Sequence, residues 1–242
     1  MSRSPHRVAL TPGYLLHHRP WRDTSRILEV LTREHGRLTL FARAVRGPRA
    51  KLAPILQPFQ PLLLSFSGRG EAPQLTAAER AAQCAPLPPA SLLAGFYLNE
   101  LLIRLTTRHD PLPELYDAYD GTLARLRAAE ALEPCLRLFE KRLLELLGYG
   151  VDLSCESASG EPLHPDGYYH FRAGHGLIRA GERAAGALAG RSLLALAREE
   201  LSGARTLEDA RRLLQAALGA CLEGRPLATR AVARAMVRKA AR

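Results

Sequence analysis

The hydrophobic pattern changes its period near residue 80, and this change restricts the chain to a mixed architecture. Before it, short apolar-rich runs bounded by turn residues predict strands at residues 8–10, 13–19, 25–32, 37–44 and 62–67. Five or six strands in so short a stretch make a small barrel. After it, a linker with Pro86, Pro88 and Pro89 leads into leucines at helical spacing. We therefore expect an α+β protein with a β-barrel domain at residues 1–80 and a helical domain at 81–242.

The helical part is predicted to contain consecutive helices with one interruption. Helices are expected at residues 91–107 and 115–126, from Pro134 to the stop at Gly148, at 192–201, and after Pro226. Thr206 is expected to cap a further helix, with Asp209 three positions on. Residues at about 150–180 break the helical pattern and predict a loop with a short hairpin around 168–171.

Positive charge is concentrated in the predicted barrel. The whole chain has a net charge of +10, and residues 1–80 hold 13 Lys and Arg against 5 Asp and Glu, a net of +8. Clustered cations displace counterions from phosphates, and aromatic rings stack on unpaired bases. We therefore predict a nucleic-acid surface, with solvation of the barrel as the alternative for any single arginine. The predicted DNA-binding residues are Arg19, Arg22, Arg26, Arg37, Phe41, Arg43, Arg46, Arg49 and Lys51.

One strand of the barrel is predicted to carry several of these residues on one face. Gly36 can take the positive φ of a turn, so residues 32–37 predict a hairpin with a return strand from Arg37. Side chains alternate along a strand, which places Arg37, Phe41 and Arg43 opposite Leu38 and Leu40.

The last predicted helix carries Arg230, Arg234, Arg238 and Arg242 at four-residue spacing. Such a stripe can meet phosphates. The interpretation favoured by the pattern is a solvated face opposite an apolar one formed by Val232 and Met236.

Motifs for catalysis, metal binding and membranes are missing from the sequence. There is no nucleotide-phosphate loop, zinc-protease motif or nucleophile elbow, and Cys84, Cys135, Cys155 and Cys221 lie far apart. A zinc site from Cys155 with His164, His170 and His175 is disfavoured by irregular spacing. We expect a cytoplasmic binding protein with no enzymatic activity, no cofactor and no membrane contact.

Several stretches resemble the RecO family of recombination mediators, in order and spacing over nearly the whole length. They are residues 15–25 (LLHHRPWRDTS), 32–37, 56–62, 68–71, 97–102, 139–140 and 147–150. The resemblance implies an N-terminal OB-fold joined to a helical domain, binding of single- and double-stranded DNA, and strand annealing. It also implies cooperation with RecR in loading RecA, with a possible link to RecF, and an association with the nucleoid.

The resemblance further implies a dock on the helical domain for the acidic C-terminal tail of the single-stranded DNA-binding protein, SSB. Our candidates are Leu136, Arg137 and Phe139, with the Arg137 guanidinium receiving the tail's carboxylates. Many family members hold zinc with four cysteines after a Gly-Tyr-Gly sequence, whereas this chain has only Cys155 there, which places it with the zinc-free branch.

Two other classes of function remain open from the sequence. One is a general RNA- or single-strand-binding OB protein, and the other is a metal-dependent nuclease, although the carboxylates of the barrel are scattered.

Overall fold

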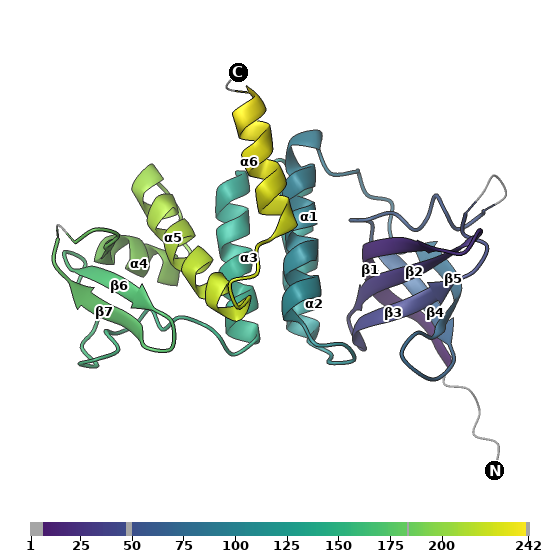
Figure 1. Ribbon diagram of the computed structural model, residues 1–242, viewed down its shortest axis with the longest axis horizontal. Helices are drawn as coiled ribbons and strands as arrows, with labels where there is room; N and C mark the ends of the chain where they lie inside the picture. Colours follow the sequence, from purple (N-terminus) through teal and green to yellow (C-terminus); the bar gives the residue numbers. More distant parts are fainter. Residues whose placement is uncertain (1–6, 47–49, 183, 241–242) are drawn as a thin grey trace, which may run out of the picture. The chain divides into compact units, whose positions relative to one another are not determined.

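The computed structural model describes residues 7–46, 50–182 and 184–240. The chain divides into two compact units (Figure 1). Unit 1 comprises Met1–Glu130 together with Leu227–Arg242, and unit 2 comprises Ala131–Pro226. Each unit is described separately below.

Unit 1 contains a closed barrel of five strands in the order β1-β2-β3-β5-β4 (Figure 1). The strands are β1 (Arg7–Trp21), β2 (Ser25–Thr32), β3 (Gly36–Ala42), β4 (Leu62–Ser67) and β5 (Gln74–Arg80). All pairs are antiparallel except β3 with β5, which pair in parallel where Phe41 lies opposite Gln74. This is the five-stranded OB-type barrel that was expected.

The first two predicted strands form one continuous strand. β1 pairs with β4 through its first half and with β2 through its second half. Its register shifts between Val8 and Thr11 and again between Leu15 and His17. Such irregularities bend a strand, which lets β1 contribute to both sides of a closed barrel.

Side chains that alternate along β3 and β4 help to fill the barrel. Along β3, Leu38, Leu40 and Ala42 are buried in the core, while the residues between them are only partly buried. The predicted hairpin is confirmed, and Gly36 has a φ of 66°. A Cβ at Gly36 would lie 2.2 Å from the carbonyl oxygen of Asp110, so this position needs glycine for space as well as for conformation.

Three helices complete unit 1: α1 (Pro89–Leu105), α2 (Pro113–Arg127) and α6 (Ala228–Ala240). Asn99 on α1 joins the helices to the barrel, because its side-chain amide donates to the Leu16 carbonyl oxygen at 2.8 Å. Its carbonyl oxygen accepts a hydrogen bond from the Tyr119 hydroxyl of α2 at 2.5 Å. Tyr14 of β1 packs edge-on against Tyr119, with ring centroids 5.1 Å apart. These contacts cover the outer face of the barrel near Tyr14.

Unit 2 contains α3 (Leu132–Leu146), α4 (Gly190–Ala197) and α5 (Ala204–Cys221) with a small sheet in the order β7-β6-β8. The strands are β6 (Tyr168–Arg172), β7 (Gly176–Ala180) and β8 (Leu188–Ala189), so the predicted hairpin around 168–171 is confirmed. The predicted cap at Thr206 is wrong, because α5 begins two residues earlier, after Gly203. Asp209 is instead buried and bonds to Arg205 and to the backbone of Ala189.

The α+β class is as expected. The barrel strands end at Arg80, whereas the compact unit that holds them also includes α1, α2 and α6. The division at residue 80 therefore marks where the strands end and the helices begin, and unit 1 extends across it.

Candidate nucleic-acid interface

One end of the barrel gathers several of the predicted arginines. The segment after β3 folds back on the β1–β2 turn, with the backbone N–H groups of Val45 and Arg46 donating to the Thr24 carbonyl oxygen at 2.9 and 3.1 Å. The Arg46 guanidinium donates to the carbonyl oxygen of Arg22 at 3.0 Å. These bonds hold Arg22, Arg43 and Arg46 close to the same turn.

The outer face of the barrel continues from this turn across three strands. Arg19 lies opposite Ile27, and Ile27 lies opposite Phe41, so the three side chains share a face. The Arg43 guanidinium lies 5.7 Å from the centroid of the Phe41 ring. Trp21, at the end of β1, is 43% exposed. Charge and aromatic surface therefore occur together on what we call the open face: Arg19, Trp21, Arg22, Ile27, Phe41, Arg43 and Arg46.

Arg26 belongs to the other side of β2. It lies opposite Ala42, a core residue, and is half-buried at the end of the strand. The pKa of His18 is lowered by burial first and then by the positive charges of Arg26 and His17. Arg26 is thus near His18 and on the inward side of its strand, not beside Phe41.

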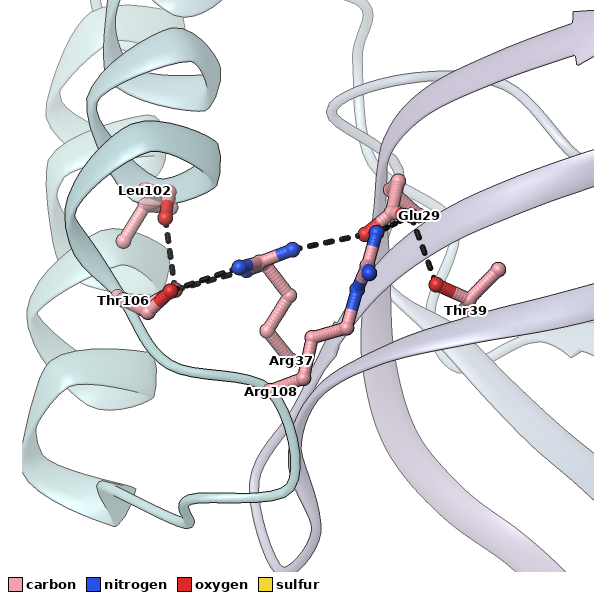
Figure 2. A network of polar contacts seen from close by, with 6 residues as sticks. All are labelled: Glu29, Arg37, Thr39, Leu102, Thr106 and Arg108. Carbon is pink, nitrogen blue, oxygen red and sulfur yellow. Dashed lines mark hydrogen bonds and ion pairs between the residues drawn. The ribbon is translucent and has the colours of Figure 1, made fainter. Parts of the chain in front are cut away.

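Arg37 lies on the same strand as Phe41, but its guanidinium reaches Thr106 at the C-terminal end of α1 (Figure 2). Its guanidinium pairs with Glu29 at 2.9 Å, and two further N–H groups donate to the hydroxyl and carbonyl oxygens of Thr106, at 3.0 and 2.7 Å. The side chain is only 10% exposed. The predicted face is confirmed in register, but its Arg37 end is occupied by protein contacts. Its predicted contact with DNA stays a prediction, and we leave Arg37 out of the open face.

Glu29 is the centre of the contacts around Arg37. It also accepts hydrogen bonds from Arg108 at 2.6 Å and from Thr39 at 2.8 Å (Figure 2). Burial raises the pKa of Glu29, but the bonds from Arg108, Thr39 and Arg37 outweigh burial, so the pKa lies below its ordinary value. The carboxylate is charged and its role is to fix Arg37.

The last two predicted DNA-binding residues, Arg49 and Lys51, come after β3 in the sequence. Lys51 is exposed, and the next residues, Leu52 and Ile55, pack against the barrel core. Arg49 lies outside the described residues. Lys51 makes no hydrogen bond to the open face among the described residues.

The predicted SSB-tail residues lie on α3 in unit 2. Phe139 is buried and Leu136 is partly buried. The Arg137 side chain is only 6% exposed, and its guanidinium donates to the fully buried Glu140 at 2.6 Å. The Arg137 guanidinium thus already has a carboxylate partner within the chain. The binding of the SSB tail by Leu136, Arg137 and Phe139 stays a prediction.

The polar groups considered for metal binding do not converge. Within residues 7–46, 50–182 and 184–240, no group of three or more His, Cys, Asp or Glu side chains is arranged to hold a metal ion. The Cys155 thiol donates to Asp152 at 3.4 Å, and Cys155 pairs with Pro162 in an isolated bridge. Local hydrogen bonds therefore organise this segment. Among the described residues, no helix is long and apolar enough to cross a membrane.

Sequence reasoning missed the contacts that join Glu29 and Arg37 to Thr106 and Arg108. Thr106 and Arg108 are distant in sequence from Glu29 and Arg37, and no local pattern links them. The signal that could have indicated a buried role was a glutamate at position 29 between the apolar residues Leu28 and Val30, since a buried charge needs a partner.

Comparisons with known proteins cover both parts of the chain. Residues 7–83 match the family model "Recombination protein O N terminal", and residues 89–231 match "Recombination protein O C terminal". A protein from Methylococcus capsulatus named DNA repair protein RecO is 45% identical over 226 residues, which cover 93% of this chain and 93% of that protein.

Proteins of the same name from two other bacteria are also similar. The one from Alkalilimnicola ehrlichii is 45% identical over 236 residues, covering 96% of this chain and 93% of its own. The one from Ralstonia nicotianae is 40% identical over 234 residues, covering 96% and 86%. The similarity thus extends through the barrel and the helices alike.

Proposed function

Because the chain belongs to the RecO family of DNA repair proteins, which are non-enzymatic recombination mediators, we propose that its barrel binds single- and double-stranded DNA and anneals complementary strands. The observation that carries the proposal is the open face. Arg19, Arg22, Arg43 and Arg46 supply positive charge there, and Trp21 and Phe41 supply rings for unpaired bases.

The mechanism is electrostatic and makes or breaks no covalent bond. The arginines screen the phosphates of a strand, which lowers the repulsion that a complementary strand meets, and base pairing supplies the recognition. If each of the four arginines contacts one phosphate of a single strand, log K should fall with log salt with a slope of about −2.8, because each contact contributes about −0.7.

The experiment compares two double variants of equal charge. Arg19→Ala/Arg43→Ala removes two cations from the open face, whereas Arg33→Ala/Arg125→Ala removes two from exposed ion pairs with Asp117 and Glu130 elsewhere in unit 1. Single-strand affinity is measured over a salt series. For the open-face variant, the slope of log K against log salt should become less steep by about 1.4, and for the control it should match wild type. Equal losses in both variants would show that net charge, rather than this face, drives binding.

A competition arm separates DNA from RNA. Unlabelled RNA and DNA oligonucleotides of one sequence are compared as competitors for the labelled DNA strand, and a strand-annealing assay is run with SSB-coated complementary strands. The proposal expects annealing of the coated DNA and unchanged strand length in the presence of Mg²⁺ or Mn²⁺. Shortened strands would indicate a nuclease.

We also propose that α3 receives the acidic tail of SSB, with Leu136, Arg137 and Phe139 in the dock. The tail's carboxylate would take the place of Glu140 or Glu133 beside the Arg137 guanidinium, a bidentate partner for carboxylates. Arg137→Ala should weaken binding of a tail peptide and leave DNA affinity unchanged, with Arg142→Ala on the same helix as control. Because Arg137→Ala leaves Glu140 buried beside a lost partner, Arg137→Gln/Glu140→Gln provides a second, uncharged variant.

The remaining parts of the proposal concern partners, metal and compartment. We propose that the protein acts with RecR to load RecA, with a possible contribution from RecF, in the cytoplasm near the nucleoid. We further propose that it belongs to the zinc-free branch of its family, because Cys155 bonds to Asp152 and the Cys155–Pro162 bridge orders the segment in place of a metal.

A further inference from the structure

The C-terminal helix α6 is attached to unit 1 through its first turn. The Glu100 carboxylate of α1 accepts hydrogen bonds from the backbone N–H groups of Ala228 and Thr229, at 2.8 and 2.9 Å, and from the Thr229 hydroxyl at 2.7 Å. The Arg230 guanidinium donates to the Tyr97 hydroxyl at 3.0 Å and lies 5.5 Å from the centre of the Tyr97 ring. Arg230 is therefore an anchoring residue.

Beyond this first turn, the large described side chains of α6 are exposed. Val232 is 46% exposed and Met236 is 61% exposed. The predicted solvated face agrees with the exposure of Arg234 and Arg238, but the apolar residues opposite them, Val232 and Met236, are exposed as well. Neither Arg234 nor Arg238 makes a hydrogen bond or an ion pair with any described residue. Arg242 lies outside the described residues.

The charge of α6 indicates what it binds. The sequence Ala228–Ala240 contains three arginines and a lysine but no acidic residue, so the helix repels cationic surfaces and attracts anionic ones. Arg234 and Arg238 are one turn apart, about 6 Å along the helix axis. That spacing is close to two steps along one DNA strand, whose phosphates are about 3.4 Å apart along the duplex axis.

We propose that the exposed arginine face of α6, formed by Arg234 and Arg238, binds a second nucleic-acid strand while the open face of the barrel holds the first. Annealing brings two polyanions together, so a protein that promotes it benefits from two cationic surfaces in one compact unit, and unit 1 contains both. The inference rests on the proposed function. It also goes beyond the family match, which ends at residue 231 and so leaves Arg234, Met236 and Arg238 unassigned.

The test removes the two arginines and leaves the anchor intact. Arg234→Ala/Arg238→Ala is compared with Arg172→Ala/Arg179→Ala, which removes the same charge from exposed positions on β6 and β7. Affinity for a first labelled strand should stay within about twofold of wild type in both variants. Capture of the complementary strand is measured as the annealing rate below saturation. In the α6 variant this rate should fall about 25-fold at 0.1 M salt, because the loss of two phosphate contacts makes the salt slope less steep by about 1.4.

Further variants distinguish charge from structure and from protein contacts. Arg234→Lys/Arg238→Lys keeps the charge and the helix propensity, so its annealing rate should be within about threefold of wild type. Circular dichroism of all variants should match wild type, because neither arginine makes a contact within the described structure.

Three results decide between the proposals. Wild-type protein that fails to bind the first strand would contradict the proposed function itself. Wild type that anneals normally, with the α6 variant no slower than its β6–β7 control, would overturn only the role of α6. If Met236→Ser changes the sedimentation mass while Arg234→Ala/Arg238→Ala anneals at the wild-type rate, α6 binds a second copy of the chain and the inference is wrong.

Discussion

Arg37→Ala should destabilise unit 1 while leaving DNA binding almost unchanged. Arg37 makes one charged hydrogen bond to Glu29 and two hydrogen bonds to Thr106, and both partners are largely buried. Breaking a buried ion pair by removing one partner costs about 3–5 kcal/mol. Arg108 and Thr39 still bond to Glu29 after the change, so we expect the lower end of that range, about 3 kcal/mol.

Arg108→Ala is the matched control for this measurement. It removes a cation from the same carboxylate, but the Arg108 side chain is 50% exposed, and an exposed pair contributes about 0.2–1 kcal/mol. The chain contains a single tryptophan, Trp21, at the end of β1, so its fluorescence during urea unfolding reports on the barrel. Because unit 2 contains no tryptophan, its unfolding does not contribute to this fluorescence transition.

The same variants also test what Arg37 does for DNA. At 0.1 M salt, Arg37→Ala should change single-strand affinity by less than about twofold, whereas Arg43→Ala should weaken it about fivefold through one lost phosphate contact. Our reasoning would be refuted if Arg37→Ala were no less stable than Arg108→Ala, or if it lost as much DNA affinity as Arg43→Ala.

Three further predictions concern other contacts of unit 1. Asn99→Ala removes two buried hydrogen bonds and should lower the free energy of unfolding by about 2–4 kcal/mol, measured by tryptophan fluorescence in urea. Glu100→Ala removes the carboxylate that caps α6 and should speed hydrogen exchange of the α6 amides, with the barrel amides unchanged as internal control. The pKa of Glu29 in the folded protein lies below its ordinary value of 4.5, so the charged carboxylate stabilises the fold above pH 4.5. This stabilisation is lost as the pH falls through the folded pKa. The urea midpoints of wild type and Glu29→Gln should therefore converge on acidification.

The placement of Phe41 on the outer face could be predicted from the sequence because alternation along a strand is a local property. Leu38, Leu40 and Ala42 fill the barrel, so Phe41 must point outward whatever the rest of the chain does. The hairpin at Gly36 was predictable for the same reason, since its positive φ depends on neighbouring residues alone.

The surroundings of an outward side chain could not be predicted in this way. Arg37 and Phe41 lie on one face of one strand, yet Thr106 on a distant helix covers the first and leaves the second partly exposed. From the sequence alone, Arg37 and Arg43 contribute equally to the predicted basic surface. Only the tertiary fold shows that Glu29 neutralises one of them.

Arg137 and Arg234 show that local charge patterns can mislead in either direction. Arg137 follows an apolar residue on α3 and was expected to receive carboxylates from another protein, but the buried Glu140, one helical turn away, already holds its guanidinium inside unit 2. Arg234 belongs to a stripe that resembles an ordinary solvated face, yet Met236, which should have packed on the opposite side, is itself exposed. Beyond Arg230, the apolar residues Val232 and Met236 and the basic residues Arg234 and Arg238 of α6 are all exposed, so this part of the helix gains little from packing against its own chain. A phosphate backbone is the partner that such a charge distribution fits.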